Sequence, residues 1–194
     1  MNPDGSIIAS GGTDGSVDIL ESETGALLNT LLGHKESVAA LAFSPTNRLV
    51  LASVSDDHTA RVWELKERAL SKSYWQSSYR IFQGHSAEIS DVGFSSDGQT
   101  FVTASNDETL RLWDVRSGRT VRQFRGHKND VLSVAFLRNE KHLVSAGRDK
   151  TLRIWDVESG ATLKVLQGHT ASVNGVAVGS NRVFTVGGYG SVRS

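Results

Sequence analysis

The sequence predicts an all-β protein built from repeats that each contain four short antiparallel strands. The first observation is a Gly-His pair that recurs at intervals of 51, 42 and 42 residues. The second is a Trp followed by an acidic residue, 28 or 29 residues after three of these histidines. A four-stranded repeat of about 40 residues is the unit of a β-propeller blade. The pairs are Gly33-His34, Gly84-His85, Gly126-His127 and Gly168-His169, and the Trp-acid dipeptides are Trp63-Glu64, Trp113-Asp114 and Trp155-Asp156.

Each repeat has the same order of elements. An alternating apolar segment follows the Gly-His pair and predicts the first strand, because a period of two places every other side chain on one face of a sheet. A second strand, a tight turn containing an Asp, a third strand carrying the Trp, and a fourth strand follow. In the second complete repeat these strands are expected at 89–94, 100–104, 109–113 and 120–124.

The repeats predict a single domain, 1–194, with full blades over 33–166 and partial blades at 1–32 and 167–194. In the first partial blade, Leu20 stands where a Trp is expected. In the last, Thr185 matches the hydroxyl position of the second strand, but Tyr189 replaces the turn Asp. We therefore expect an incomplete propeller, a fragment of a longer one, whose open sheet edges would favour self-association.

These motifs make the chain similar to the WD-repeat (tryptophan-aspartate repeat) family over almost its whole length. The resemblance implies that the His, a second-strand Ser or Thr, the turn Asp and the Trp of each complete blade form a buried hydrogen-bonded tetrad. Such a set must be complete, because an unpaired buried polar group costs roughly 1–3 kcal/mol. The implied tetrads are His34, Ser53, Asp57 and Trp63; His85, Thr103, Asp107 and Trp113; and His127, Ser145, Asp149 and Trp155.

The middle of the chain resembles the Gβ-like branch of this family, which includes the receptor for activated C kinase. The similar segments include 95–99, 109–114 and 130–136. This resemblance implies an alternative function as a ribosome- or RNA-associated scaffold that uses basic residues such as Arg148 and Lys150. The branch commonly carries Arg-Asp-Lys in the second-to-third-strand turn of its first blade, whereas this chain has an acid, Asp56, in the Arg position.

Composition narrows the function classes. Lys plus Arg and Asp plus Glu are 21 each, so the zero net charge gives no general reason to expect binding to nucleic acid or to a membrane. There is no cysteine and hence no thiol chemistry. Four of the six histidines follow Gly at the repeat spacing, so no metal, cofactor or catalytic site is predicted. The chain lacks a signal sequence and long apolar runs, which favours a cytoplasmic or nuclear location.

The sequence favours a non-catalytic scaffold that presents propeller loops to other proteins or peptides. An enzyme is the less favoured alternative, because Ser, His and Asp recur in every complete repeat, whereas catalysis needs one exposed set. In the family, the residues three after each His and one before each turn Asp are directed at the commonest docking face. The acidic members would favour a partner segment carrying Lys or Arg. The positions are Ser37, Asp56, Glu88, Asn106, Asp130, Arg148 and Ser172.

One insertion distinguishes the first complete repeat. From Trp63 to His85 the chain runs 22 residues, against 14 from Trp to His in the next two repeats. The insertion includes Tyr74, Trp75 and Tyr79. Two interpretations remain open: a loop whose aromatic side chains pack on the blade, or a loop that contacts a partner.

Overall fold

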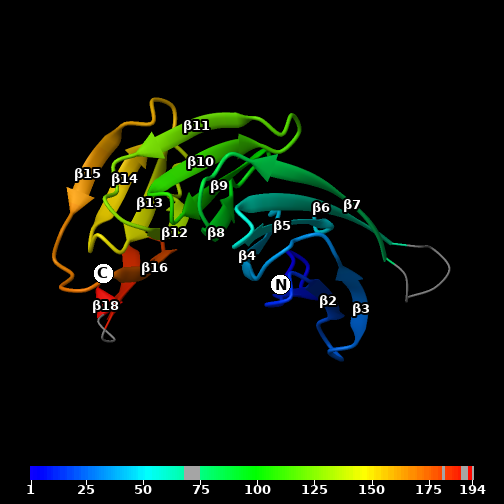
Figure 1. Cartoon of the computed structure of the whole chain (residues 1–194). Helices are drawn as coiled ribbons and strands as arrows, with labels where there is room; N and C mark the ends of the chain where they lie inside the picture. Colours follow the sequence, from blue (N-terminus) through cyan, green and yellow to red (C-terminus); the bar gives the residue numbers. More distant parts are fainter. Residues whose placement is uncertain (68–74, 181, 189–191, 194) are drawn as a thin grey trace.

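The computed structural model describes residues 1–67, 75–180, 182–188 and 192–193. Within these residues, strands pair antiparallel into five sheets that follow one another along an arc (Figure 1). The predicted all-β propeller fold is confirmed, with three four-stranded blades and a three-stranded sheet on either side of them. The described part of the chain contains no helix with the length and hydropathy needed to cross a bilayer.

The strands follow the predicted order. The N-terminal sheet comprises β1 (Ile7–Gly11), β2 (Val17–Glu21) and β3 (Leu27–Leu31). Blade 1 comprises β4 (Val38–Phe43), β5 (Val50–Ser55), β6 (Thr59–Glu67) and β7 (Trp75–Gln83). Blade 2 comprises β8 (Ile89–Phe94), β9 (Thr100–Ser105), β10 (Thr109–Asp114) and β11 (Thr120–Arg125). Blade 3 comprises β12 (Val131–Phe136), β13 (His142–Gly147), β14 (Leu152–Asp156) and β15 (Thr162–Leu166). The C-terminal sheet comprises β16 (Val173–Val178), β17 (Val183–Gly187) and β18 (Val192–Arg193).

The strand that follows each Gly-His pair lies on the inside of the arc, where β4, β8, β12 and β16 contact one another in turn (Figure 1). Each of these inner strands contains a register shift next to its first residue, a β-bulge that increases local twist. The N-terminal sheet has no strand of this kind, and β1, which matches a second strand, contacts β4 instead.

A hydrogen-bond relay that the sequence analysis did not predict joins the inner strands. The Asp91 carboxylate accepts the Ser133 hydroxyl at 2.8 Å and the Val134 N–H at 2.9 Å. The Ser133 oxygen in turn accepts the Val176 N–H at 3.2 Å. Burial raises the pKa of Asp91 although these donors favour its charged form. The relay links blade 2 to blade 3, and blade 3 to the C-terminal sheet.

The apolar core lies between the sheets. The buried apolar side chains of the described residues gather in four clusters, one at each interface between neighbouring sheets. Between blades 1 and 2, the Phe82 ring lies edge-on to Phe101, with centroids 4.8 Å apart, and beside Trp113 at 5.9 Å. Aromatic pairs in this geometry add about 0.5–1.5 kcal/mol to the stabilisation from burial. Each blade is therefore held by its neighbours as much as by its own hydrogen bonds.

The insertion in blade 1 lengthens a hairpin. Strands β6 and β7 have nine residues each, paired in register from Thr59 with Gln83 to Glu67 with Trp75. Extra residues on both arms of a hairpin extend the ladder without changing which face a side chain occupies. Tyr79 packs on Trp63 with ring centroids 4.7 Å apart. Tyr74 and the Trp75 side chain lie outside the residues that the structure describes.

Candidate partner-binding face and its supporting tetrads

The structure brings the four members of each expected tetrad into hydrogen-bond contact. In blade 1, His34 Nδ1 lies 2.9 Å from Asp57 Oδ2, and His34 Nε2 lies 2.8 Å from Ser53 Oγ. Trp63 Nε1 donates to the same oxygen of Ser53 at 2.8 Å. The Asp carboxylate can only accept, so the histidine proton is assigned to Nδ1, and Nε2 accepts the serine hydroxyl.

The same contacts recur in the other two blades, with Thr in place of Ser in blade 2. The histidine–carboxylate distances are 2.7 Å for His85 with Asp107 and 2.9 Å for His127 with Asp149. The histidine–hydroxyl distances are 2.8 Å for His85 with Thr103 and 2.7 Å for His127 with Ser145. The indole–hydroxyl distances are 2.9 Å for Trp113 with Thr103 and 2.8 Å for Trp155 with Ser145.

The tetrad Asp also holds two loops together. Asp57 Oδ2 accepts the Lys35 N–H at 3.0 Å, and Oδ1 accepts both the N–H and the hydroxyl of Thr59, at 2.9 and 2.6 Å. Burial would raise the pKa of Asp57, but the bonds from Thr59, Lys35 and His34 outweigh it and lower the pKa to about 2. The hydroxyl two residues after each tetrad Asp was not predicted, although the Asp-x-Thr pattern recurs in all three blades.

The residue after each tetrad Asp adopts a left-handed backbone conformation. The φ angles are 66° at His58, 67° at Glu108 and 67° at Lys150, and the matching position in the N-terminal sheet is Gly15 at 82°. A non-glycine residue rarely adopts this conformation unless its surroundings impose it. Here the Asp carboxylate accepts both the N–H and the hydroxyl of the Thr two residues later, and this turn holds the residue between them in the left-handed conformation.

An arginine two residues before each Trp was also missed. The guanidinium carbons of Arg61, Arg111 and Arg153 lie 5.9, 5.8 and 5.8 Å from the indole centroids of their own blades. The sequence does contain a signal for this contact. Residues two apart in a strand share a face, so an Arg two residues before the Trp lies on the same face as the indole. The Gly of the Gly-His pair lies close beside this stack: a Cβ on Gly84 would lie 2.8 Å from Arg111 Nη1 and 3.2 Å from the Trp113 ring.

The Asp, His and Ser of a tetrad have the hydrogen-bond order of a hydrolytic triad, but they are not accessible. Ser53 Oγ already contacts the imidazole and accepts the indole N–H, and the residue is 0% exposed. A nucleophilic serine needs room for a substrate carbonyl and for oxyanion donors. Among the described residues, no group of three or more His, Asp or Glu side chains is arranged to hold a metal ion.

Six of the seven expected partner-binding residues lie in three pairs on one face, which we call the loop face: the Gly-His loops together with the β5–β6, β9–β10 and β13–β14 turns. The seventh, Ser172, pairs with Gly188, which follows β17. In each pair a turn N–H donates to a loop carbonyl. The donor–acceptor distances are 3.0 Å for Asp56 to Ser37, 2.9 Å for Asn106 to Glu88, 2.8 Å for Arg148 to Asp130 and 2.7 Å for Gly188 to Ser172.

The balance of charge on the loop face differs between the blades. Blades 1 and 2 carry the exposed carboxylates of Glu36, Glu88 and Glu108 and the half-buried Asp56, with the exposed cation Lys35 beside Glu36 in blade 1. Blade 3 carries the exposed cations Lys128, Arg148 and Lys150. Asp130, grouped with the acidic positions by sequence, forms an ion pair with Arg148 at 3.1 Å. The acidic part of the loop face is therefore confined to blades 1 and 2.

Three relatives illustrate what the chain is similar to. The small ribosomal subunit protein RACK1 of Drosophila melanogaster is 43% identical over 101 residues, covering 52% of this chain and 31% of the relative. The cross-pathway control WD-repeat protein 2 of Flammulina velutipes is 43% identical over 96 residues, 50% of this chain and 30% of the relative. The nuclear distribution protein nudF of Aspergillus flavus is 32% identical over 123 residues, 63% of this chain and 26% of the relative.

The chain thus spans between about a quarter and a third of the length of these relatives. The similarity confirms the resemblance to WD-repeat proteins of the Gβ-like branch. The family described as the TEP-1 second beta-propeller matches residues 3–194. With its repeated blades and almost its whole length matched, this chain belongs to the TEP-1 second beta-propeller family of WD-repeat β-propellers.

Proposed function

We propose that this chain is a non-catalytic protein-interaction scaffold of the cytoplasm or nucleus, and that the loop face over blades 1 and 2 docks a basic segment of a partner protein. The observation that supports the proposal is the pairing of loop and turn residues by main-chain hydrogen bonds, from Asp56 to Ser37 and from Asn106 to Glu88. An acidic face attracts Lys and Arg side chains and steers their approach.

The tetrads support this proposal because they hold the loops in place before a partner arrives. Each tetrad Asp binds its histidine and a main-chain N–H of the Gly-His loop. A surface that is already ordered loses little conformational freedom on binding, so more of the contact energy appears as affinity. The loops thus behave as parts of a rigid scaffold rather than as flexible segments.

The experiment measures binding of a fluorescein-labelled peptide in which Lys alternates with Ser, with a Glu-for-Lys peptide as its counterpart. We expect Asp56→Lys/Glu88→Lys to weaken binding of the basic peptide at least tenfold. Glu158→Lys is the matched control, since Glu158 is an exposed acid in the β14–β15 turn, outside the loop face. If the double variant retains its fold and binds the basic peptide with the same affinity as the wild-type protein, this docking face is rejected.

A second candidate function is ribosome or RNA association through blade 3. Lys128, Arg148 and Lys150 lie exposed on adjacent loops of that blade, and one relative is named a small ribosomal subunit protein. Binding to phosphates weakens steeply with added salt. Under this alternative, Lys128→Glu/Lys150→Glu would abolish salt-sensitive binding of an RNA hairpin, while Asp56→Lys/Glu88→Lys would leave that binding unchanged or tighter.

A further inference from the structure

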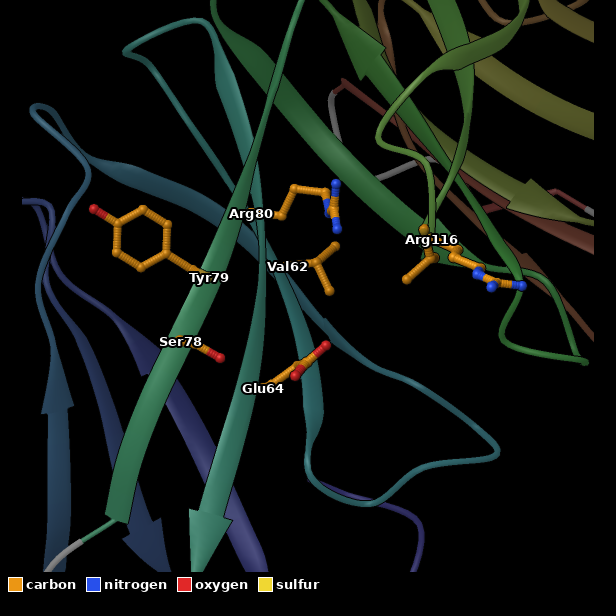
Figure 2. Close-up of a pocket in the computed structure, with 7 residues that line it drawn as sticks. Val62, Glu64, Ser78, Tyr79, Arg80 and Arg116 are labelled. Atoms are coloured by element: carbon orange, nitrogen blue, oxygen red, sulfur yellow. The ribbon is translucent and has the colours of Figure 1, made fainter.

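A cavity of about 620 Å³ opens between blades 1 and 2, outside the loop face (Figure 2). Its walls come from both blades. Strands β6 and β7 contribute Val62, Glu64, Ser78, Tyr79 and Arg80, and the β10–β11 turn contributes Val115 and Arg116. Val115 and Arg116 also line a neighbouring hollow beside Gln99 and Asp114. The two spaces border one another along the Arg116 turn.

The long hairpin leaves an acidic side chain in this cavity. In blades 2 and 3 the residue after the Trp begins a tight turn, where Asp114 accepts the Ser117 N–H at 2.6 Å and Asp156 accepts the Ser159 N–H at 2.8 Å. In blade 1, β6 continues to Glu67, so Glu64 lies within the strand and is exposed. Its carboxylate points into the space below Arg80 (Figure 2).

The other end of the cavity carries two arginines, near the Asp114 carboxylate of the neighbouring hollow. Arg80 points from β7 towards blade 2, where its Cδ lies against Gly118, 3.1 Å from where a Cβ would be (Figure 2). Arg116 stands on the same turn. At the next interface the matching arginine, Arg122, packs in the same way against Gly160, but the turn residue matching Arg116 is the acidic Glu158. The blade 1–blade 2 interface is therefore the more cationic of the two.

In the part of the chain that the structure describes, strand β7, which borders this cavity, has one edge without a partner strand. It is outermost in blade 1, and β6 is the one described strand with which it pairs. Residues 78–81 are exposed, and Arg80 is the one charged residue in the nine residues of β7. The outer strand of blade 2 has two arginines in six residues. Charged side chains protect edge strands from pairing, so β7 is less protected than its counterpart.

We propose that an extended acidic segment of a partner protein pairs with the free edge of β7 and places a carboxylate at the Arg80 and Arg116 end of the cavity. Peptides add to sheet edges in this way, with main-chain bonds providing affinity and alternate side chains providing specificity. This surface is separate from the loop face, so it adds a second docking site to the proposed scaffold.

Strand alternation specifies the rest of the partner segment. The Tyr79 ring points to the side of β7 opposite Arg80 (Figure 2), and strand alternation places Ile81 on the same side as Tyr79; the two residues are 46% and 42% exposed. A paired strand therefore presents acidic side chains to the cavity and apolar side chains to Tyr79 and Ile81. Glu64 pairs in register with Ser78, two residues from Arg80, and would repel a carboxylate there. Repulsion by Glu64 and attraction by Arg80 together set the register of the bound segment.

The test uses a fluorescein-labelled nine-residue peptide in which Glu alternates with Val, titrated by anisotropy and mapped by amide chemical shifts. We expect binding with shifts at residues 78–83, and at least tenfold weaker binding for Arg80→Glu and for Arg116→Glu. Arg122→Glu is the matched control and should change affinity less than twofold. Two further peptides carry N-methyl groups on alternate amides, one on the amides that face β7 and the other on the amides that face away. The first should lose binding, and the second should keep it.

Other outcomes overturn the proposal. Absence of binding at peptide concentrations in the millimolar range would remove the site. Equal weakening by Arg80→Glu and Arg122→Glu, or equal affinity for a peptide with Lys in place of Glu, would reduce it to a general charge effect. Full binding by both methylated peptides would exclude strand pairing. Shifts confined to the loop face would assign acidic peptides to the other surface, without affecting the case for basic peptides there.

Discussion

His85 Nδ1 lies 2.7 Å from Asp107 Oδ2, and this contact joins a Gly-His loop to a turn 22 residues later in the chain. The same carboxylate accepts the Ser86 N–H at 3.1 Å and the Thr109 hydroxyl at 2.6 Å. One side chain in the turn thus satisfies donors from the Gly-His loop and from strand β10. Equivalent Asp residues in blades 1 and 3 do the same.

Removing this carboxylate is expected to destabilise the protein far more than removing a nearby surface charge. Asp107→Ala and Asp149→Ala each leave a buried imidazole and main-chain donors without an acceptor, at a cost of roughly 1.5–3 kcal/mol. Lys150→Ala removes an exposed side chain and should change the free energy of unfolding by less than about 0.5 kcal/mol. Urea denaturation measures all three, and similar midpoints would contradict the role of the tetrads.

Stability is expected to fall on acidification in two stages. Burial lowers the pKa of His34 and His127 below the usual value of 6.5, although their Asp partners partly counter it. A depressed histidine pKa means that the unfolded chain binds more protons, so stability is lost as the pH falls below about 6.5. The pKa of Asp57, lowered to about 2, adds a contribution present above its usual pKa of 3.8 and lost as the pH approaches 2. Urea midpoints that do not change between pH 7 and pH 3 would contradict both assignments.

The left-handed turn positions are expected to tolerate glycine better than a branched residue. Glu108 has a φ of 67°, a conformation that costs an L-residue roughly 1–2 kcal/mol. Glu108→Gly removes that strain but increases the freedom of the unfolded chain, so we expect a change of less than about 1 kcal/mol. Glu108→Val should destabilise clearly. Lys150→Gly and Lys150→Val are the matching pair, and a Val variant as stable as its Gly partner would refute the argument.

The glycine before each tetrad histidine is expected to be needed for packing. Gly84→Ala forces a methyl group against Arg111 and the Trp113 ring, and overpacking of this kind typically costs about 1–3 kcal/mol. Gly175→Ala is the control, since nothing lies within 4 Å of the new methyl group. Thermal unfolding followed by Trp fluorescence compares the two. Equal melting temperatures would show that the arginine stack moves aside without cost.

Local pattern was sufficient for most of the architecture. The alternation of apolar residues located the strands, and the recurrence of Gly-His, Asp and Trp located the blades and the side chains of each tetrad. These features repeat because every complete blade packs against a neighbouring sheet on each side. The sequence could therefore predict what one blade does within itself, as with His127, Asp149 and Trp155.

Contacts between blades were decided by the tertiary structure. Asp91 meets Ser133, 42 residues away, and Arg80 meets the turn of Gly118, 38 residues away, because neighbouring sheets pack face to face. Within blade 3, the Asp130–Arg148 ion pair also required the tertiary structure, and it divided an acidic set that the sequence analysis had treated as one. Charge, burial and edge exposure depend on what the next sheet places opposite a residue. A repeat pattern read along one chain specifies the blade but not the surface formed where two blades meet.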